Sequence, residues 1–184
     1  IGHDSVTKDI TYENAQARYR TFTLMNTANM EGAIVIGTGD MSEVALGWST
    51  FNGDQMAMYG MNAGLPKTCI KVVTKYFENI YPDLKDCINS VIGTPISPEL
   101  KGNQLTEDII GKYEINDFIL YHFLVNGDSG ERIVYLLNKF FNLSENDAID
   151  YVNNFNNRFY KQQFKRLTMP EGIKILDLSL SPRS

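Results

Sequence analysis

The chain has 184 residues with 17 basic and 22 acidic side chains, which gives a formal net charge of −5. This length is typical of one domain with a buried core, and a hydrophobic content of 43% excludes an intrinsically disordered chain. The acidic balance argues against a general nucleic-acid binder, and no stretch approaches the roughly 20 apolar residues of a membrane span. Two cysteines and two histidines, spread along the sequence, form neither a disulfide framework nor a zinc-binding spacing.

The first ten residues, IGHDSVTKDI, lack the basic and apolar regions of a signal peptide. Together with the composition, this predicts a cytoplasmic protein that binds neither nucleic acid nor membranes.

The first quarter of the chain combines helical and extended patterns. Apolar residues recur at helical spacing over residues 11–30, where Thr11 is a plausible N-cap, so a helix of about five turns is predicted. The continuous apolar run at residues 33–36 is typical of a strand covered on both faces, as in a parallel sheet. A glycine turn at residues 37–40 then leads into a second helix at residues 42–46. Strand, glycine turn and helix in this order indicate an α/β nucleotide-binding unit.

Residues 47–64 contain four glycines without a clear period, but their aromatic residues and methionines argue against disorder, so a functional loop is predicted. A second loop is predicted over residues 93–112, with its mobile part at about residues 101–112. Helices are predicted at residues 66–80, 84–91, 117–125, 129–141 and 144–167. The helical C-terminal part (113–167) is followed by a tail (168–184) that forms a strand or a docked segment. Because one strand needs partners, we expect the remaining strands upstream of residue 1.

The strongest local signal for chemistry is the sequence GTGDMSE at residues 37–43. Its glycines allow a backbone to approach a phosphate closely, and the hydroxyl of Thr38 can bind anionic oxygens at a helix N-terminus. Asp40 and Glu43 are three residues apart and lie on one helix face, where Glu43 can hold Mg²⁺ through hard oxygen ligands. The alternative is an ordinary helix cap with acidic residues favoured by the helix dipole.

Two basic positions are also candidates for anion binding. Asn14 and Arg18 lie one helical turn apart and can clamp a carboxylate or phosphate, although a solvated helix face explains them equally simply. Lys67 stands at a helix start, where it opposes the helix dipole, and this unfavourable placement suggests a bound anion.

Trp48, Ser49, Thr50 and Phe51 place hydroxyls between two flat apolar side chains, which suits the stacking of an aromatic ring. Buried aromatic residues more often belong to a core, so this reading stays open. Lys165, in the basic end of the last predicted helix, is explained by the helix dipole alone.

Taken in order, these segments closely resemble glutamine-dependent NAD⁺ synthetase. The match is to the C-terminal synthetase domain and runs over nearly the whole chain. The combination of GTGD-x-SE-x-ALGWST with NGDxMxxY is specific to that family among the PP-loop ATP pyrophosphatases. The matching segments are YENAQAR (12–18), IVIGTGDMSEVALGWSTFNGDQM (34–56), NAGLPKT (62–68), SPEL (97–100), RFYKQQFKR (158–166) and LSPR (180–183).

The resemblance implies an α/β fold: a partial adenine-nucleotide α-hydrolase-like domain, Rossmann-like with a parallel sheet, and helix-rich because its first strands are missing. It implies a two-step reaction in which ATP adenylates the nicotinate carboxylate of deamido-NAD⁺ and ammonia then displaces AMP to give NAD⁺. The implied cofactor is Mg²⁺, with ATP as cosubstrate, ammonia from a glutaminase domain and a homo-oligomeric assembly. Such chemistry needs positioning and charge stabilisation and no protein nucleophile, so no catalytic side chain is named.

The resemblance also implies roles for individual residues. Those expected to contact deamido-NAD⁺ are Asn14, Arg18, Glu43, Trp48, Ser49, Thr50, Phe51 and Lys165. Those expected to contact ATP are Thr38 and Lys67, and Glu43 is also the expected Mg²⁺ ligand.

Two parts of the family pattern do not occur in this sequence: the SGGxDS pyrophosphate-binding loop and the nitrilase-like glutaminase domain. We expect both to lie upstream, and the chain alone to be inactive. One alternative is another PP-loop ATP pyrophosphatase, such as a GMP or asparagine synthetase relative, which should lack the WSTF and NGDQM segments. The other is a non-catalytic helical interaction or dimerisation module.

Overall fold

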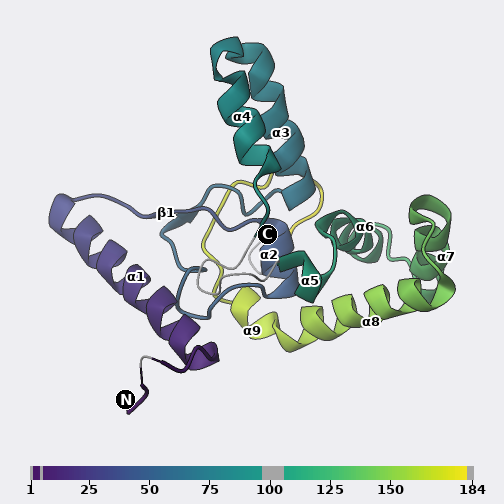
Figure 1. The fold of residues 1–184 in the computed structure, drawn as a ribbon, viewed down its shortest axis with the longest axis horizontal. Coiled ribbons are helices and arrows are strands. Elements are labelled where there is room, and N and C mark those ends of the chain that lie inside the picture. The colour runs from purple at the N-terminus through teal and green to yellow at the C-terminus, as the bar shows by residue number, and fades with distance from the viewer. Residues whose placement is uncertain (1, 5, 97–105, 182–184) are drawn as a thin grey trace.

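A computed structural model describes residues 2–4, 6–96 and 106–181 (Figure 1). Helices dominate these residues. They are α1 Ile10–Glu31, α2 Met41–Leu46, α3 Lys67–Ile80, α4 Lys85–Gly93, α5 Thr106–Ile110, α6 Tyr113–Leu124, α7 Gly130–Phe141, α8 Glu145–Lys161 and α9 Gln163–Arg166, with a 3₁₀ turn at Pro82–Leu84. Within the described ranges, none of the helices is both long enough and apolar enough for a membrane span.

The sheet of the described residues consists of two short parallel strands, β1 Ile36–Gly37 and β2 Tyr59–Gly60. Ile36 pairs with Tyr59 and Gly37 with Gly60. The strand predicted at residues 33–36 is therefore shifted toward its C-terminal end, and its partner lies inside the segment that was predicted as a loop. The parallel arrangement itself is confirmed.

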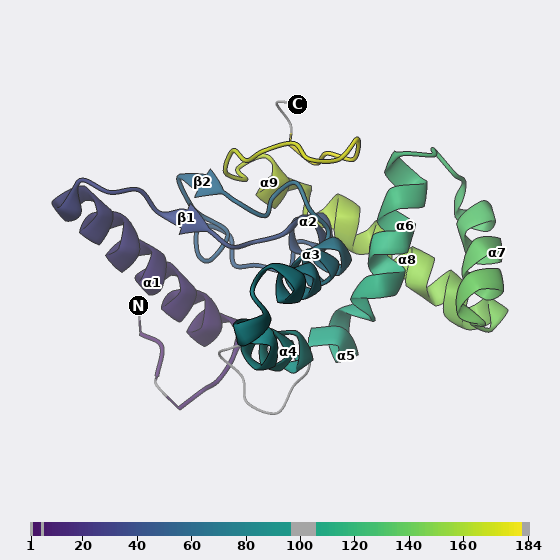
Figure 2. The ribbon, with the colours of Figure 1, turned by 90° about the horizontal axis from the view of Figure 1, so that it is seen from above.

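The hydrophobic core lies where α6, α7 and α8 pack together and against α2. Figure 2 shows α6 crossing α8, with α7 beyond it. This packing removes nearly all of the apolar surface at the centre from water, and such burial is the main favourable contribution to folding. The fully buried side chains of this core include Met41, Leu46, Ile119, Leu120, Ile133, Leu137 and Phe155.

The first helix begins one residue earlier than predicted, and its N-cap is Asp9 rather than Thr11. Asp9 Oδ1 accepts a hydrogen bond from the Tyr12 backbone N–H at 3.0 Å, which satisfies one of the open amides of the first turn. The helix ends at Gly32 in the left-handed conformation, with φ 61°. Along its length α1 buries only Ala17 and Ala28, and Figure 1 shows it projecting from the rest of the chain.

The single helix predicted over residues 144–167 is interrupted at Gln162, so α8 and α9 are separate. At this break the buried guanidinium of Arg166 donates to the Phe159 carbonyl at 2.6 Å. In an uninterrupted helix that carbonyl would accept from the backbone N–H of Gln163 instead. The helix predicted from residue 117 begins instead at Tyr113, because Tyr113 and Ile115 add to its buried face.

Part of the predicted loop at residues 101–112 is helical, since α5 occupies Thr106–Ile110. Residues 101–105 of that loop, like the SPEL segment at residues 97–100, lie outside the described residues. The tail contains neither helix nor strand from residue 167 to 181. It is a docked segment, held where the Gly60 backbone N–H donates to the Glu171 carbonyl at 2.6 Å and where Leu178 is buried.

The packing predicts which leucines carry stability. Leu137→Ala should lower the free energy of unfolding by about 2–5 kcal/mol, because Leu137 is fully buried and its truncation leaves a cavity. Leu24→Ala on α1 is the matched control, because Leu24 is 56% exposed; its effect should stay within about 0.5 kcal/mol. Urea unfolding measures both, and equal losses would contradict the placement of the core.

Candidate active site

The starts of α2 and α3 meet beside the C-terminal end of β1. The Met41 backbone N–H donates to the Leu65 carbonyl at 3.0 Å, which joins the two helix starts. Asp40 caps α2 by accepting from the Glu43 N–H at 3.0 Å, and Glu43 accepts from the Asp40 N–H at 3.3 Å. This capping box confirms that the GTGDMSE segment is a helix start and fixes both carboxylates on one side of it.

Lys67, the first residue of α3, places its ammonium between these carboxylates. Its Nζ lies 2.6 Å from Asp40 Oδ2 and 2.9 Å from Glu43 Oε1, and it also stands over the Tyr113 ring at 5.1 Å. Asp40 is only 2% exposed, so the lysine compensates a carboxylate that is removed from water. Two carboxylates and one ammonium leave the cluster with one net negative charge.

Burial raises the pKa of Glu43, and the neighbouring Asp40 carboxylate raises it further, while Lys67 opposes both. For Lys67, burial lowers the pKa but the two carboxylates outweigh it, so its pKa lies above the ordinary value. The ammonium is therefore held in its charged form, in a position where a phosphate could compete with the two carboxylates for it.

Oxygen donors of this kind are those that Mg²⁺ prefers, and Mg²⁺ is commonly held by one or two carboxylates together with substrate phosphates. No group of three or more His, Cys, Asp or Glu side chains in residues 2–4, 6–96 and 106–181 could hold a metal ion by itself. Glu43, which lines the pocket, fits a site in which one protein carboxylate and the phosphates of a bound ligand share the ion, whereas Asp40 is 2% exposed and is not a lining residue.

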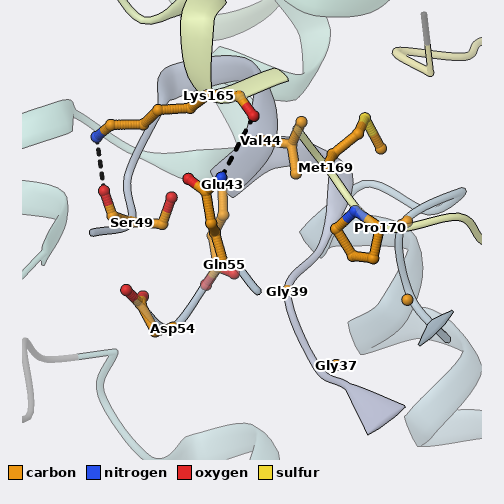
Figure 3. Close-up of a pocket in the computed structure, with 12 residues that line it drawn as sticks. Gly37, Gly39, Glu43, Val44, Ser49, Asp54, Gln55, Lys165, Met169 and Pro170 are labelled. Carbon is orange, nitrogen blue, oxygen red and sulfur yellow. Dashed lines mark hydrogen bonds between the residues drawn. The ribbon is translucent and has the colours of Figure 1, made fainter. Parts of the chain in front are cut away.

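A pocket opens beside this cluster (Figure 3), where β1, α2, the segment at residues 49–55 and the start of the tail meet. Its volume of about 50 Å³ is room for a few water-sized groups. Parallel α/β sheets bind ligands at this end of their strands. The lining residues are Gly37, Gly39, Glu43, Val44, Ser49, Asp54, Gln55, Gly60, Ala63, Lys165, Met169 and Pro170.

Lys165 reaches the pocket from α9. Its Nζ donates to the carbonyls of Gly47 and Ser49 at 2.7 and 2.6 Å, so the ammonium closes the C-terminal end of α2; Figure 3 shows the bond to Ser49. Burial lowers the pKa of Lys165 and the nearby Arg158 lowers it further, against the opposing charge of Asp54. A second cation thus lies across the pocket from the acidic cluster.

The two predicted site residues of α1, Asn14 and Arg18, contact the loop that follows α2. Thr50 Oγ1 donates to Asn14 Oδ1 at 2.9 Å, and Arg18 Nε donates to the Phe51 carbonyl at 3.1 Å. On the other side, the Phe51 ring meets the Phe164 ring edge-on at 5.2 Å. The loop that follows α2 is therefore held between α1 and α9.

The predicted site residues do not all face the pocket. Glu43, Ser49 and Lys165 line it. Lys67 is not a lining residue, but it forms an ion pair with Glu43. Trp48 instead packs against the hydrophobic core, with the Arg158 guanidinium over its ring at 5.4 Å. Thr38 is exposed and is not among the lining residues, and its carbonyl accepts from Asn62 Nδ2 at 3.4 Å.

Two polar residues of the pocket were missed by the sequence reasoning, although both lie in the NGDQM segment it quoted. Asp54 accepts from the Thr50 backbone N–H at 2.7 Å and presents its carboxylate at the pocket. Gln55 donates to Thr168 Oγ1 at 2.8 Å, while its buried Oε1 has no partner among the described residues. A buried acceptor without a partner is uncommon and is available to a bound ligand.

Removing the central cation should destabilise the chain. Lys67→Met should lower the free energy of unfolding at pH 7 by about 2–3 kcal/mol, because it leaves Asp40 buried without its counter-ion. Lys75→Met is the matched control: Lys75 pairs with Glu78 at 2.7 Å but is 54% exposed, so its loss should cost less than about 1 kcal/mol. Urea unfolding of both variants makes the comparison.

The loss of unfolding free energy in Lys67→Met should also depend on pH. The folded pKa of Lys67 is raised, so its contribution is complete below the ordinary value of 10.5 and disappears as the pH rises through the higher folded value. Stability curves of the wild type and Lys67→Met should therefore converge above pH 10.5. A gap that stays constant to higher pH would show that the ion pair is not its source.

Comparison with known proteins places these features in a family. A family model described as NAD synthase matches residues 2–170. The glutamine-dependent NAD(+) synthetase of Mycobacterium leprae is 35% identical, with the match covering 100% of this chain and 32% of that protein. The chain thus spans about a third of the length of such curated relatives.

Solved structures agree on the fold. A glutamine-dependent NAD(+) synthetase from Cytophaga hutchinsonii superposes with a TM-score of 0.72 at 21% identity, covering 96% of this chain and 27% of that one. An NMN synthetase from Francisella tularensis gives a TM-score of 0.61 at 22% identity, covering 92% and 56%. The adenine-nucleotide α-hydrolase-like fold expected from the sequence is confirmed. The chain belongs to the NAD synthase family.

Proposed function

We propose that the chain contributes to NAD⁺ synthesis by a glutamine-dependent synthetase. In the first step, a carboxylate oxygen of the nicotinate group of deamido-NAD⁺ attacks the α-phosphorus of ATP, forming a P–O bond and releasing pyrophosphate. In the second, ammonia attacks the carbonyl carbon, AMP leaves and a proton is lost. Neither step needs a protein nucleophile; both need the reactants held in place and their charge compensated.

The observation that carries the proposal is the position of the Asp40–Glu43–Lys67 cluster beside the pocket that Glu43 and Lys165 both line. It combines anion-binding and metal-binding groups within one small volume. When bound, Mg²⁺ would be held by Glu43 and would neutralise phosphate charge. Lys67 would bind ATP phosphates, a role supported by the raised pKa that keeps it charged.

The nicotinate end of deamido-NAD⁺ would lie at the pocket. Ser49, Gln55 and Lys165 line it, and Gln55 Oε1 is a hydrogen-bond acceptor without a partner among the described residues. Thr50 and Phe51 follow Ser49 in the loop and bond to Asn14 and Arg18; none of these four residues lines the pocket, so they would contact the dinucleotide outside it. Thr38, which is exposed, would contact ATP outside the pocket, and Trp48 would act from the core side of the loop.

We further propose that the chain does not complete the reaction alone. The SGGxDS segment that binds pyrophosphate in this family does not occur in the sequence, and ammonia would come from a glutaminase domain. Homo-oligomerisation is supported by exposed apolar side chains on α1 and α3, such as Phe22, Met30, Val72 and Tyr76.

Ligand-dependent stability tests binding. A ligand present at 100 times its dissociation constant adds about 2.7 kcal/mol to the free energy of unfolding, so deamido-NAD⁺ with Mg-ATP should raise the melting temperature. Lys165→Met should reduce this rise, whereas Lys161→Met, which changes an exposed lysine at the end of α8, should leave it unchanged. A non-catalytic interaction module would show no rise in any variant, which would contradict the proposal.

An assay of the same preparation, with its intact mass checked against 20.9 kDa, tests turnover. With ATP, Mg²⁺, deamido-NAD⁺ and ammonia we expect no NAD⁺ from the chain alone. NAD⁺ formed by a chain of that mass would refute the requirement for the SGGxDS loop.

A further inference from the structure

Asp117 is a buried carboxylate that the proposed chemistry does not use. It lies on α6 within the hydrophobic core, 7% exposed, yet it contacts the starts of two other helices. Its Oδ1 accepts a hydrogen bond from the Ser42 hydroxyl on α2. Its Oδ2 accepts from the Thr68 backbone N–H at 3.0 Å and from the Thr68 hydroxyl at 2.7 Å.

These bonds supply the cap that α3 lacks. The residue at the N-cap position of α3 is Pro66, which makes no side-chain cap hydrogen bond. The first amides of the helix are bound from outside instead: the Lys67 N–H by Ser42 Oγ at 2.8 Å and the Thr68 N–H by Asp117. A negative charge at this end also favours the helix dipole.

The same contacts determine where Lys67 lies. Lys67 is the first residue of α3, so the direction of its side chain depends on how that helix starts. Asp40 and Glu43, which hold its ammonium, belong to the start of α2. Asp117 bonds to both helix starts at once, through Ser42 on one and Thr68 on the other.

Keeping this carboxylate in the core is costly. Burial raises the pKa of Asp117. The hydrogen bonds from Ser42 and Thr68 lower it, but they do not outweigh burial. An apolar side chain at this position would serve packing alone, so the charge calls for another explanation.

We propose that Asp117 is a positioning residue of the site: acting through Ser42 and Thr68, it aligns α2 with α3 so that the Lys67 ammonium lies between Asp40 and Glu43. The consequence for ATP binding rests on the proposed function; the alignment itself does not.

The test uses the full chain and two substitutions of Asp117. Asp117→Ala removes every bond, whereas Asp117→Asn keeps the volume and can still accept from Thr68 but not from the Ser42 hydroxyl. The matched control is Asn116→Ala, which removes a buried polar side chain on the same helix. Its Nδ2 donates to the carbonyls of Ile110, Gly111 and Lys112 at 2.9, 3.3 and 3.1 Å, all between α5 and the start of α6.

The readout is the ¹H–¹⁵N signal of the Lys67 ammonium, which exchanges slowly with water only while carboxylates hold it. Lys67→Met identifies the signal by its loss. We expect Asp117→Ala to abolish the ammonium signal and Asp117→Asn to weaken it. Asn116→Ala should keep the signal, although its melting temperature falls by about as much as that of Asp117→Ala. A full signal in Asp117→Ala, or an equal loss in folded Asn116→Ala, would overturn the proposal.

Binding of Mg-ATP, measured by calorimetry on the same variants, separates the two proposals. Where the wild type binds, Asp117→Ala should bind about 10- to 100-fold more weakly, since misplaced binding groups cost that much. If the ammonium signal behaves as expected but no variant binds Mg-ATP, the alignment by Asp117 stands and the assignment of Lys67 to ATP fails. If Mg-ATP binds equally to the wild type and to an Asp117→Ala variant that has lost the ammonium signal, the alignment again stands and the assignment of Lys67 to ATP fails.

Discussion

The ammonium of Lys67, held by Asp40 and Glu43 at 2.6 and 2.9 Å, is the interaction on which the proposed site depends. It joins the start of α3 to the start of α2, and therefore joins the segment after β2 to the segment after β1. Without it, a carboxylate that is 2% exposed would remain unpaired. The capping box shares Asp40 and Glu43 with this ion pair, and Glu43 also lines the pocket.

Stability and chemistry are divided between different parts of the chain. The fully buried apolar side chains gather in α6, α7 and α8 and include Met41 and Leu46 of α2, whereas α3 buries none of its residues and α1 only two small ones. The site lies between these parts and is held largely by polar contacts. Asp117 is the connection, because it extends from the apolar core to the helix starts that carry the charges.

The sequence patterns predicted the features that depend on residues close to one another in the chain. The helix periods, the helix starts near residues 129 and 144 and the acidic start of α2 could be read directly, and the family motifs added Lys165 and Asn14. Contacts between distant residues could not be read. The strand β2 has only two residues, the break at Gln162 depends on Arg166, and Asp117 acts on Ser42 from 75 positions away. A lone aspartate in a helix pattern gives no sign of such a role.

The most direct test of the account is a map of backbone amide chemical shifts of the chain, titrated with deamido-NAD⁺ and Mg²⁺ to about 1 mM, which detects affinities down to the millimolar range. We predict the largest shifts at residues 39–55 and 162–170, which surround the pocket, and none on α7. Shifts confined to residues 70–93, or no shifts at all, would contradict the claim that this pocket with its ion-paired lysine is the substrate site.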